Sequence, residues 1–144
     1  MKAMFSPQNT PLCDSVTLAY RRVRAEPGQL TVLRRALERW LDAVHVSPEL
    51  TRDVLLASYE ALANAVEHAY RDGASGTLDL EATLIPGTRQ VEVAIIDRGS
   101  WRANDTDPGT SSRGHGLTLI NSLADTATVA PADSGTVVTM RWSI

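Results

Sequence analysis

Three polar residues recur at one spacing on a predicted helix and could together bind a metal ion and accept a proton. Glu60, Asn64 and His68 are each four residues apart. On an α-helix this spacing rotates the side chain by only about 40° per step, so the three groups line one edge. A carboxylate can accept a proton, and a carboxamide oxygen is a hard ligand suited to Mg²⁺. Neighbouring alanines leave room for a ligand, although an ordinary solvated helix face and a structural role for His68 stay open.

A second candidate is Asp97, which ends an apolar predicted strand and is followed two residues later by Gly99. A carboxylate at the end of a sheet can accept a hydrogen bond from a purine amino group, and a glycine lets the backbone approach a ligand closely. Asp-x-Gly is also an ordinary turn sequence. The motif therefore indicates a binding site only in combination with others.

A third candidate is the run Arg113-Gly114-His115-Gly116-Leu117, which opens a short predicted helix. Two glycines before a helix expose backbone amides beside the positive end of the helix dipole, an arrangement that binds phosphate. Arg113 and His115 add side-chain donors. The Gly-Lys-Ser/Thr element is missing, so this is not a Walker motif.

The strands and helices that the sequence predicts must position these residues. Apolar residues spaced by three and four predict helices, and apolar–polar alternation predicts strands. Because the predicted strands are grouped rather than separated by crossover helices, we expect an α+β fold. It would be a two-layer α/β sandwich with a mixed, mostly antiparallel sheet and its helices on one face. The expected strands are Ser15–Val23, Thr77–Ile85, Gln90–Asp97, Thr126–Ala130 and Thr136–Trp142, and the expected helices are Pro27–Ala43, Ser47–Arg71 and Leu117–Ala124.

Length, charge and apolar content limit the class of protein. The 144 residues fit one domain, which we expect over residues 15–144 after a flexible lead-in over residues 1–14. The net charge of −3 comes without a basic cluster, which argues against nucleic acid as a partner. The sequence has no apolar run of the roughly 18 residues that a membrane span needs. The single Cys13 agrees with a reducing compartment, so we expect a cytoplasmic protein without a membrane partner.

In chain order, the three motifs resemble the ATP-binding domain of the gyrase, chaperone, histidine-kinase and mismatch-repair superfamily, which has the Bergerat-type fold. Within that superfamily, the segments Asp97–Arg102, Asp107–Gly109 and Arg113–Leu117 resemble the anti-sigma-factor serine/threonine kinases. The likeness is strongest to the regulatory kinase domains that accompany serine phosphatases in actinobacteria. It extends over Ser15–Trp142.

The resemblance implies roles for five residues in binding ATP and Mg²⁺. Asn64 would ligate the Mg²⁺ that bridges the phosphates, and Glu60 would be the base that receives the proton of an attacking serine hydroxyl. Asp97 would bind the adenine amino group, with Gly99 giving clearance. Thr136 would help to line the adenine pocket.

The same resemblance implies that Arg98–Arg113 forms a lid over ATP and that the following glycine run covers the phosphates. His115 stands where the subgroup more often has arginine, so a charged contact there would depend on pH. The residues expected to cover or contact the phosphates are Arg113, Gly114, His115, Gly116 and Leu117.

Two functions follow from these expectations. The first is an anti-sigma factor that uses MgATP to phosphorylate a small anti-anti-sigma (STAS-type) protein on serine or threonine and that sequesters a sigma factor. The second is a non-catalytic ATP-binding module that binds the sigma factor or the antagonist without phosphorylating it. Glu60 favours the first, because a module that only binds nucleotide needs no base. The resemblance also implies a homodimer, with its interface expected within Ser15–Leu41.

Overall fold

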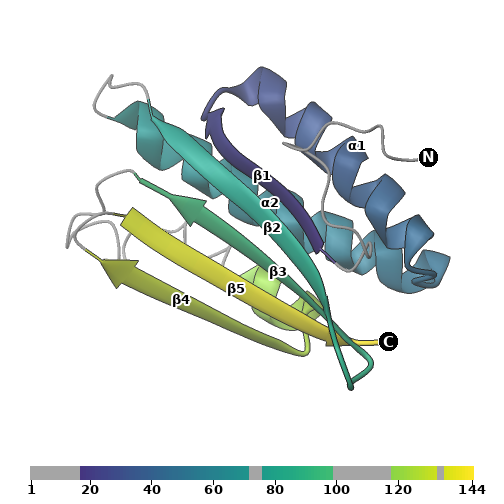
Figure 1. Cartoon of the computed structure of the whole chain (residues 1–144). Helices are drawn as coiled ribbons and strands as arrows, with labels where there is room; N and C mark the ends of the chain where they lie inside the picture. The colour runs from purple at the N-terminus through teal and green to yellow at the C-terminus, as the bar shows by residue number, and fades with distance from the viewer. Residues whose placement is uncertain (1–16, 72–75, 99–117, 133–134) are drawn as a thin grey trace.

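The computed structural model describes residues 17–71, 76–98, 118–132 and 135–144, which form one five-stranded sheet with helices on one face (Figure 1). The strand order is β1-β2-β3-β5-β4, and all four neighbouring pairs are antiparallel. The α+β fold is confirmed, and the parallel pairing that a mixed sheet would need does not occur among the described strands. The elements are β1 (Thr17–Arg24), α1 (Pro27–Ala43), α2 (Pro48–Arg71), β2 (Thr77–Ile85), β3 (Gln90–Asp97), β4 (Thr126–Ala132) and β5 (Gly135–Ser143), with a short helix over residues 118–123.

Several element boundaries agree with the sequence patterns, and the differences lie at the ends. The predicted bounds of α1, β2 and β3 match the structure, whereas β1 extends one residue further to Arg24. β4 and β5 are longer than predicted because their ladder continues to the pair Ala132 and Gly135. The predicted lead-in over residues 1–14 and most of the Arg98–Arg113 loop lie outside the described residues.

The two long helices form an antiparallel hairpin with a connection of only four residues, 44–47. His45 adopts a positive φ of 66° in this connection and lets the chain reverse. The Ser47 hydroxyl oxygen accepts a hydrogen bond from the backbone N–H of Leu50 at 3.2 Å and so caps the start of α2. The connection therefore sets α2 beside α1 in a fixed direction.

The core lies between the helix hairpin and the inner face of the sheet. Buried residues alternate along β3 with half-buried ones, as expected for a strand covered on one face. The short helix over residues 118–123 joins this layer, because Ile120 is buried and the Trp142 indole N–H donates to the Leu123 carbonyl at 2.8 Å. The largest fully buried side chains are Trp142, Leu33, Leu37, Leu41, Leu62, Leu78, Leu80, Ile95, Ile120 and Met140.

Candidate functional site

The end of β3 and the start of β5 bring two predicted site residues together. Asp97 and Thr136 are directly opposite each other in the antiparallel ladder, and both are buried. Asp97 continues the inward-facing series of Val91, Val93 and Ile95, so its carboxylate lies on the sheet face that the helices cover. The structure therefore places two polar side chains at the end of an otherwise apolar face.

The Thr136 hydroxyl is compatible with a polar ligand at this place. Its oxygen is buried and has no hydrogen-bond partner among the described residues. Buried polar atoms in proteins are nearly always hydrogen-bonded, because an unsatisfied one costs about 1–3 kcal/mol. A buried hydroxyl beside a buried carboxylate fits the adenine-pocket role implied by the resemblance.

Gly135 makes the close approach of the two strands possible. Its φ is +145°, and a Cβ at this position would lie 1.8 Å from the backbone oxygen of Asp97 and 2.9 Å from the Cα of Arg98. No other residue fits this backbone without displacing the end of β3. This contact joins residues 38 positions apart, so no local sequence pattern could have revealed it.

The other two predicted residues come from the second half of α2. Glu60 and Asn64 are half-buried and lie one turn apart, beside the stripe of α2 that packs on the sheet. Ala57, Ala61 and Ala65 belong to this stripe and are at most 2% exposed. The alanines that we interpreted as room for a ligand are thus mainly core residues, which let α2 approach the sheet closely.

The fold directs this half of α2 toward the end of the sheet that holds Asp97. Beyond Arg71 the chain returns to the sheet at Thr77, where β2 begins, and Leu78 of β2 pairs with Asp97 of β3. Figure 1 shows the end of α2, the end of β3 and the start of β5 at the same side of the molecule. The end of α2 therefore lies at the same end of the fold as Asp97 and Thr136, and Glu60 and Asn64 precede it on the same helix.

The remaining predicted residues cannot be placed. Gly99 and the run Arg113, Gly114, His115, Gly116 and Leu117 lie outside the described residues, as does the side chain of His68. The described residues contain no group of three or more His, Cys, Asp or Glu that could hold a metal ion. A single amide ligand such as Asn64 still fits Mg²⁺, which usually takes few protein ligands and completes its shell with phosphate oxygens and water.

An ion pair that the sequence analysis missed lies beside Asp97. Arg98 donates to both carboxylate oxygens of Asp79, with N–O distances of 2.9 and 2.8 Å. The backbone N–H of Arg22 donates to the same carboxylate at 2.8 Å. Burial alone would raise the pKa of Asp79, but the hydrogen bonds from Arg98 and Arg22 and the positive charge of Arg98 outweigh it and lower the pKa.

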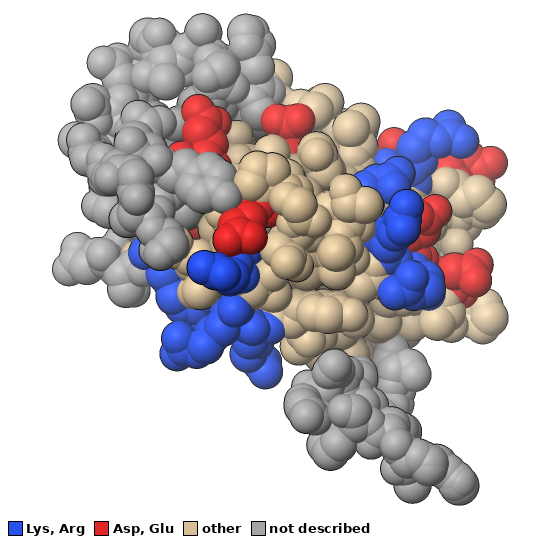
Figure 2. All heavy atoms as spheres, turned by 90° about the horizontal axis from the view of Figure 1, so that it is seen from above, with Lys and Arg blue, Asp and Glu red and all other residues tan. Residues whose placement is uncertain are grey.

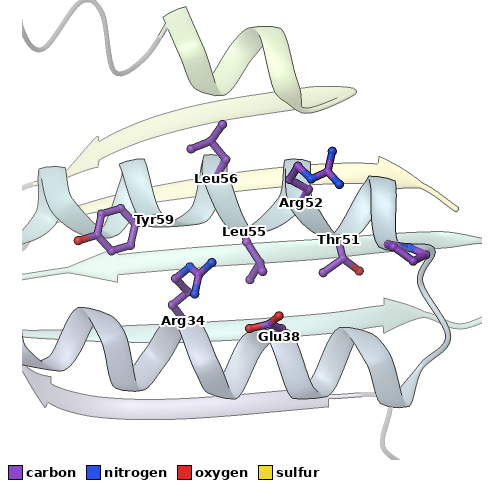
Figure 3. Close-up of a pocket in the computed structure, with 8 residues that line it drawn as sticks. Arg34, Glu38, Thr51, Arg52, Leu55, Leu56 and Tyr59 are labelled. Carbon is purple, nitrogen blue, oxygen red and sulfur yellow. The ribbon is translucent and has the colours of Figure 1, made fainter.

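A separate hollow of about 510 Å³ lies between α1 and α2 (Figure 3). Arg34 and Glu38 point from α1 toward α2, while Thr51 and Leu55 point from α2 toward α1. Exposed apolar side chains occur on the same helices, including Leu56 and Tyr59 at its edge. None of the residues predicted to bind ATP lines this hollow, which is therefore distinct from the candidate site.

The charged side chains do not form one continuous basic surface in the view from above the helices. Figure 2 shows Lys and Arg in two groups at opposite ends, with a broad area of uncharged residues between them. Among the described helices, none is long and apolar enough to cross a membrane.

The fold agrees with comparisons to known proteins. Residues 23–142 match the family model of the histidine kinase-like ATPase domain. The chain belongs to this family, whose nucleotide-binding fold it shares. The chain spans less than half the length of two of the curated relatives that it matches, 29% and 48%. It spans most of the length of two others, 86% and 87%.

Within the family, the relatives confirm the resemblance to the anti-sigma-factor kinases. The serine-protein kinase RsbW of Bacillus pumilus is 27% identical over 142 residues, which cover 88% of this chain and 86% of the relative. The RsbW protein of Oceanobacillus iheyensis is 33% identical over 78 residues, covering 54% and 48%. A crystal structure of the RsbU and RsbW domains of a Mycobacterium tuberculosis protein aligns with a TM-score of 0.69 at 26% identity, covering 88% of this chain and 32% of that chain.

Proposed function

We propose that this chain is an ATP-dependent serine/threonine protein kinase that phosphorylates an anti-anti-sigma protein of STAS type and, as an anti-sigma factor, sequesters a sigma factor. The observation that carries the proposal is the buried Asp97 beside the Thr136 hydroxyl, which has no hydrogen-bond partner among the described residues. They lie at one end of a histidine kinase-like ATPase fold. Serine-protein kinases of the RsbW type are among its relatives.

The proposed roles follow from the chemistry of each side chain. The Asp97 carboxylate accepts a hydrogen bond from the adenine amino group, and the Thr136 hydroxyl lines the same pocket. Glu60 accepts the proton that a serine hydroxyl loses as its oxygen attacks the terminal phosphorus of ATP, and the bond between that phosphorus and the bridging oxygen breaks so that ADP leaves. Asn64 would hold Mg²⁺, which neutralises phosphate charge when it is bound. Phosphoryl transfer depends mainly on positioning and charge neutralisation, so this small set of groups suffices.

The test compares two substitutions one helical turn apart. Asn64→Ala should weaken MgATP binding and abolish phosphorylation together, because a metal ligand acts in both the ground state and the transition state. Glu60→Gln should leave nucleotide affinity nearly unchanged and slow phosphorylation by about 10²- to 10⁴-fold, the usual cost of losing a general base. Calorimetry measures the affinity, and labelled ATP with a panel of STAS-type proteins measures the transfer.

Glu49→Gln is the matched control, because it makes the same change at an exposed position in the first turn of α2. It should transfer phosphate at the rate of the parent. A Glu60→Gln variant that is as fast as the parent would remove Glu60 from the role of base. If the parent binds ATP but phosphorylates no STAS-type protein, the non-catalytic binding module replaces the kinase as the proposed function.

Sigma-factor capture and a homodimer are parts of the same proposal. β1 and α1 make up most of the region, Ser15–Leu41, in which we expect the dimer interface. β1 is at the edge of the sheet and, among the described strands, pairs only with β2, which would allow a second chain to pair with its other edge. Sedimentation of the parent chain with and without a sigma factor measures both associations.

A further inference from the structure

The ion pair between Asp79 and Arg98 lies on the sheet face opposite to Asp97. Leu78 and Leu80 point into the core from β2, so Asp79, which alternates with them, points to the outer face. Arg98 directly follows Asp97 and points to the same outer face as Asp79, since it reaches both carboxylate oxygens. The consecutive residues Asp97 and Arg98 thus lie on opposite faces of the sheet. Asp97, which is proposed to bind adenine, lies on the inner face, and Arg98 forms a bidentate ion pair on the outer face.

Asp79 is held firmly, which makes it a rigid partner for Arg98. Its side chain is only 6% exposed, whereas that of Arg98 is 35% exposed. The backbone N–H of Arg22, whose φ of 58° belongs to an irregularity between Tyr20 and Val23 of β1, donates to one Asp79 oxygen. A bidentate arginine–carboxylate pair fixes both distance and orientation. Asp79 therefore connects β1 and β2 to the residue that follows Asp97.

The backbone at the end of β3 is thereby restrained on two sides. On the β2 side, the Arg98 side chain is anchored by Asp79. On the β5 side, Gly135 packs against the backbone of Asp97 and Arg98 so closely that a Cβ would not fit. Restraining the Cα of residue 98 limits the rotation of the preceding peptide, and so limits the directions in which the Asp97 carboxylate can point.

We propose that Asp79 is a positioning residue of the nucleotide site: by anchoring Arg98 on the outer face, it aims the Asp97 carboxylate on the inner face and so sets the preference for adenine over guanine. The inference rests on the proposed binding of ATP. Adenine presents an amino donor where guanine presents a carbonyl acceptor, so a fixed carboxylate accepts a hydrogen bond from the first and repels the second. A carboxylate that can turn away discriminates less.

The ratio of two affinities separates positioning from simple stabilisation of the fold. A variant that is only less stable has a smaller folded fraction, which reduces the apparent affinity for ATP and for GTP by the same factor. A variant with a misdirected Asp97 loses affinity for ATP more than for GTP. The ratio of the two dissociation constants therefore changes only if Asp79 acts on the direction of Asp97.

The experiment titrates the parent chain and its variants with fluorescent N-methylanthraniloyl derivatives of ATP and GTP, after circular dichroism has confirmed folding. Asp79→Asn and Arg98→Met should each reduce the ATP-over-GTP preference at least threefold. The double variant should reduce it no further, because both changes break one interaction. Glu92→Gln is the control: it removes an ion pair of similar length, 2.8 Å to Arg141, from strands of the same sheet. It should keep the parental ratio.

The possible outcomes distinguish a failure of the positioning role from a failure of the proposed function. If the parent prefers ATP and both single variants keep that preference, the positioning role is overturned and the proposed function stands. If Glu92→Gln reduces the preference as much as the other two, the effect is not specific to Asp79 and the inference is again overturned. A parent that binds neither nucleotide overturns the proposed function and the inference together. Should Asp79→Asn not fold, Arg98→Met carries the test, since Arg98 is partly exposed.

Discussion

Asp97 and Thr136 differ from ordinary residues at strand ends because both are buried while carrying polar groups. At the end of a sheet, polar side chains usually turn toward water, and burial of a carboxylate or a hydroxyl is costly unless it is hydrogen-bonded. The chain retains both groups on its inner face, beside the half of α2 that carries Glu60 and Asn64. The Thr136 hydroxyl has no hydrogen-bond partner among the described residues, and a ligand bound at this place would supply one.

Replacing Asp97 by asparagine tests this role at the scale of one residue. The amide is weaker than the carboxylate as an acceptor and can turn its NH₂ group toward the adenine amino group. Since a hydrogen bond to a charged group contributes about 1.5–3 kcal/mol, we expect roughly a 10- to 100-fold loss of ATP affinity. Isothermal calorimetry measures it. Asp125→Asn makes the same change at an exposed residue and should keep the affinity; an unchanged Asp97→Asn would exclude Asp97 from the site.

At the scale of elements, the start of β5 and the end of β3 act as one unit. The ladder pairs Thr136 with Asp97, and the preceding Gly135 lies against the Asp97 carbonyl. This approach is possible only because residue 135 has no Cβ. The geometry of the candidate site thus depends on β5 as much as on the strand that carries the carboxylate.

A series of glycine-to-alanine variants tests this dependence. Gly135→Ala combines an unfavourable φ with a clash against backbone and should cost at least about 3 kcal/mol of unfolding free energy. Gly87→Ala has a positive φ but open space and should cost about 1 kcal/mol. Gly28→Ala, in the first turn of α1 with open space and no positive φ, should be neutral or stabilising by up to about 1 kcal/mol. Urea unfolding measures the three changes in unfolding free energy. An equal loss for the variants at positions 87 and 135 would contradict the clash.

At the scale of the whole molecule, the ion pairs on the outer face of the sheet differ in burial. The pair of Arg21 and Glu81 and that of Arg141 and Glu92 are partly exposed, and pairs at the surface contribute at most about 1 kcal/mol. Asp79 is buried and links three segments that are distant in sequence. Its ionisation should therefore contribute to the stability of the whole sheet.

The pH dependence of stability tests the contribution of Asp79. Because the pKa of Asp79 is lowered in the folded chain, its stabilising effect is present above the unfolded-state pKa of about 3.9 and is lost as the pH falls through the lower folded-state value. Asp79→Asn should cost about 1–3 kcal/mol at pH 7, less than a fully buried pair would because Arg98 is partly exposed. This difference from the parent should shrink toward pH 3. Urea unfolding from pH 7 to pH 3 measures it, with Glu92→Gln as a control that changes little; a cost of Asp79→Asn independent of pH would contradict the assignment.

The amino-acid sequence alone determined the elements and the family. The bounds of α1, β2 and β3 followed from periodicity, because this signal is local. The spacing of Glu60 and Asn64 and the motif at Asp97 indicated a nucleotide-binding family that the comparison with known proteins confirms. The functional roles of these residues stay predictions.

Only the tertiary structure decided which polar residues are buried and what holds them. Asp79 alternates with leucines as an exposed residue would, and its burial depends on Arg98 and Arg22, which are 19 and 57 residues away in sequence. The need for glycine at 135 and the burial of the alanines on α2 likewise arise from contacts between distant elements. The periodicity of a sequence shows which face of an element is apolar. The partners of a charged side chain, however, depend on how the strands are aligned, and that alignment exists only in the folded chain.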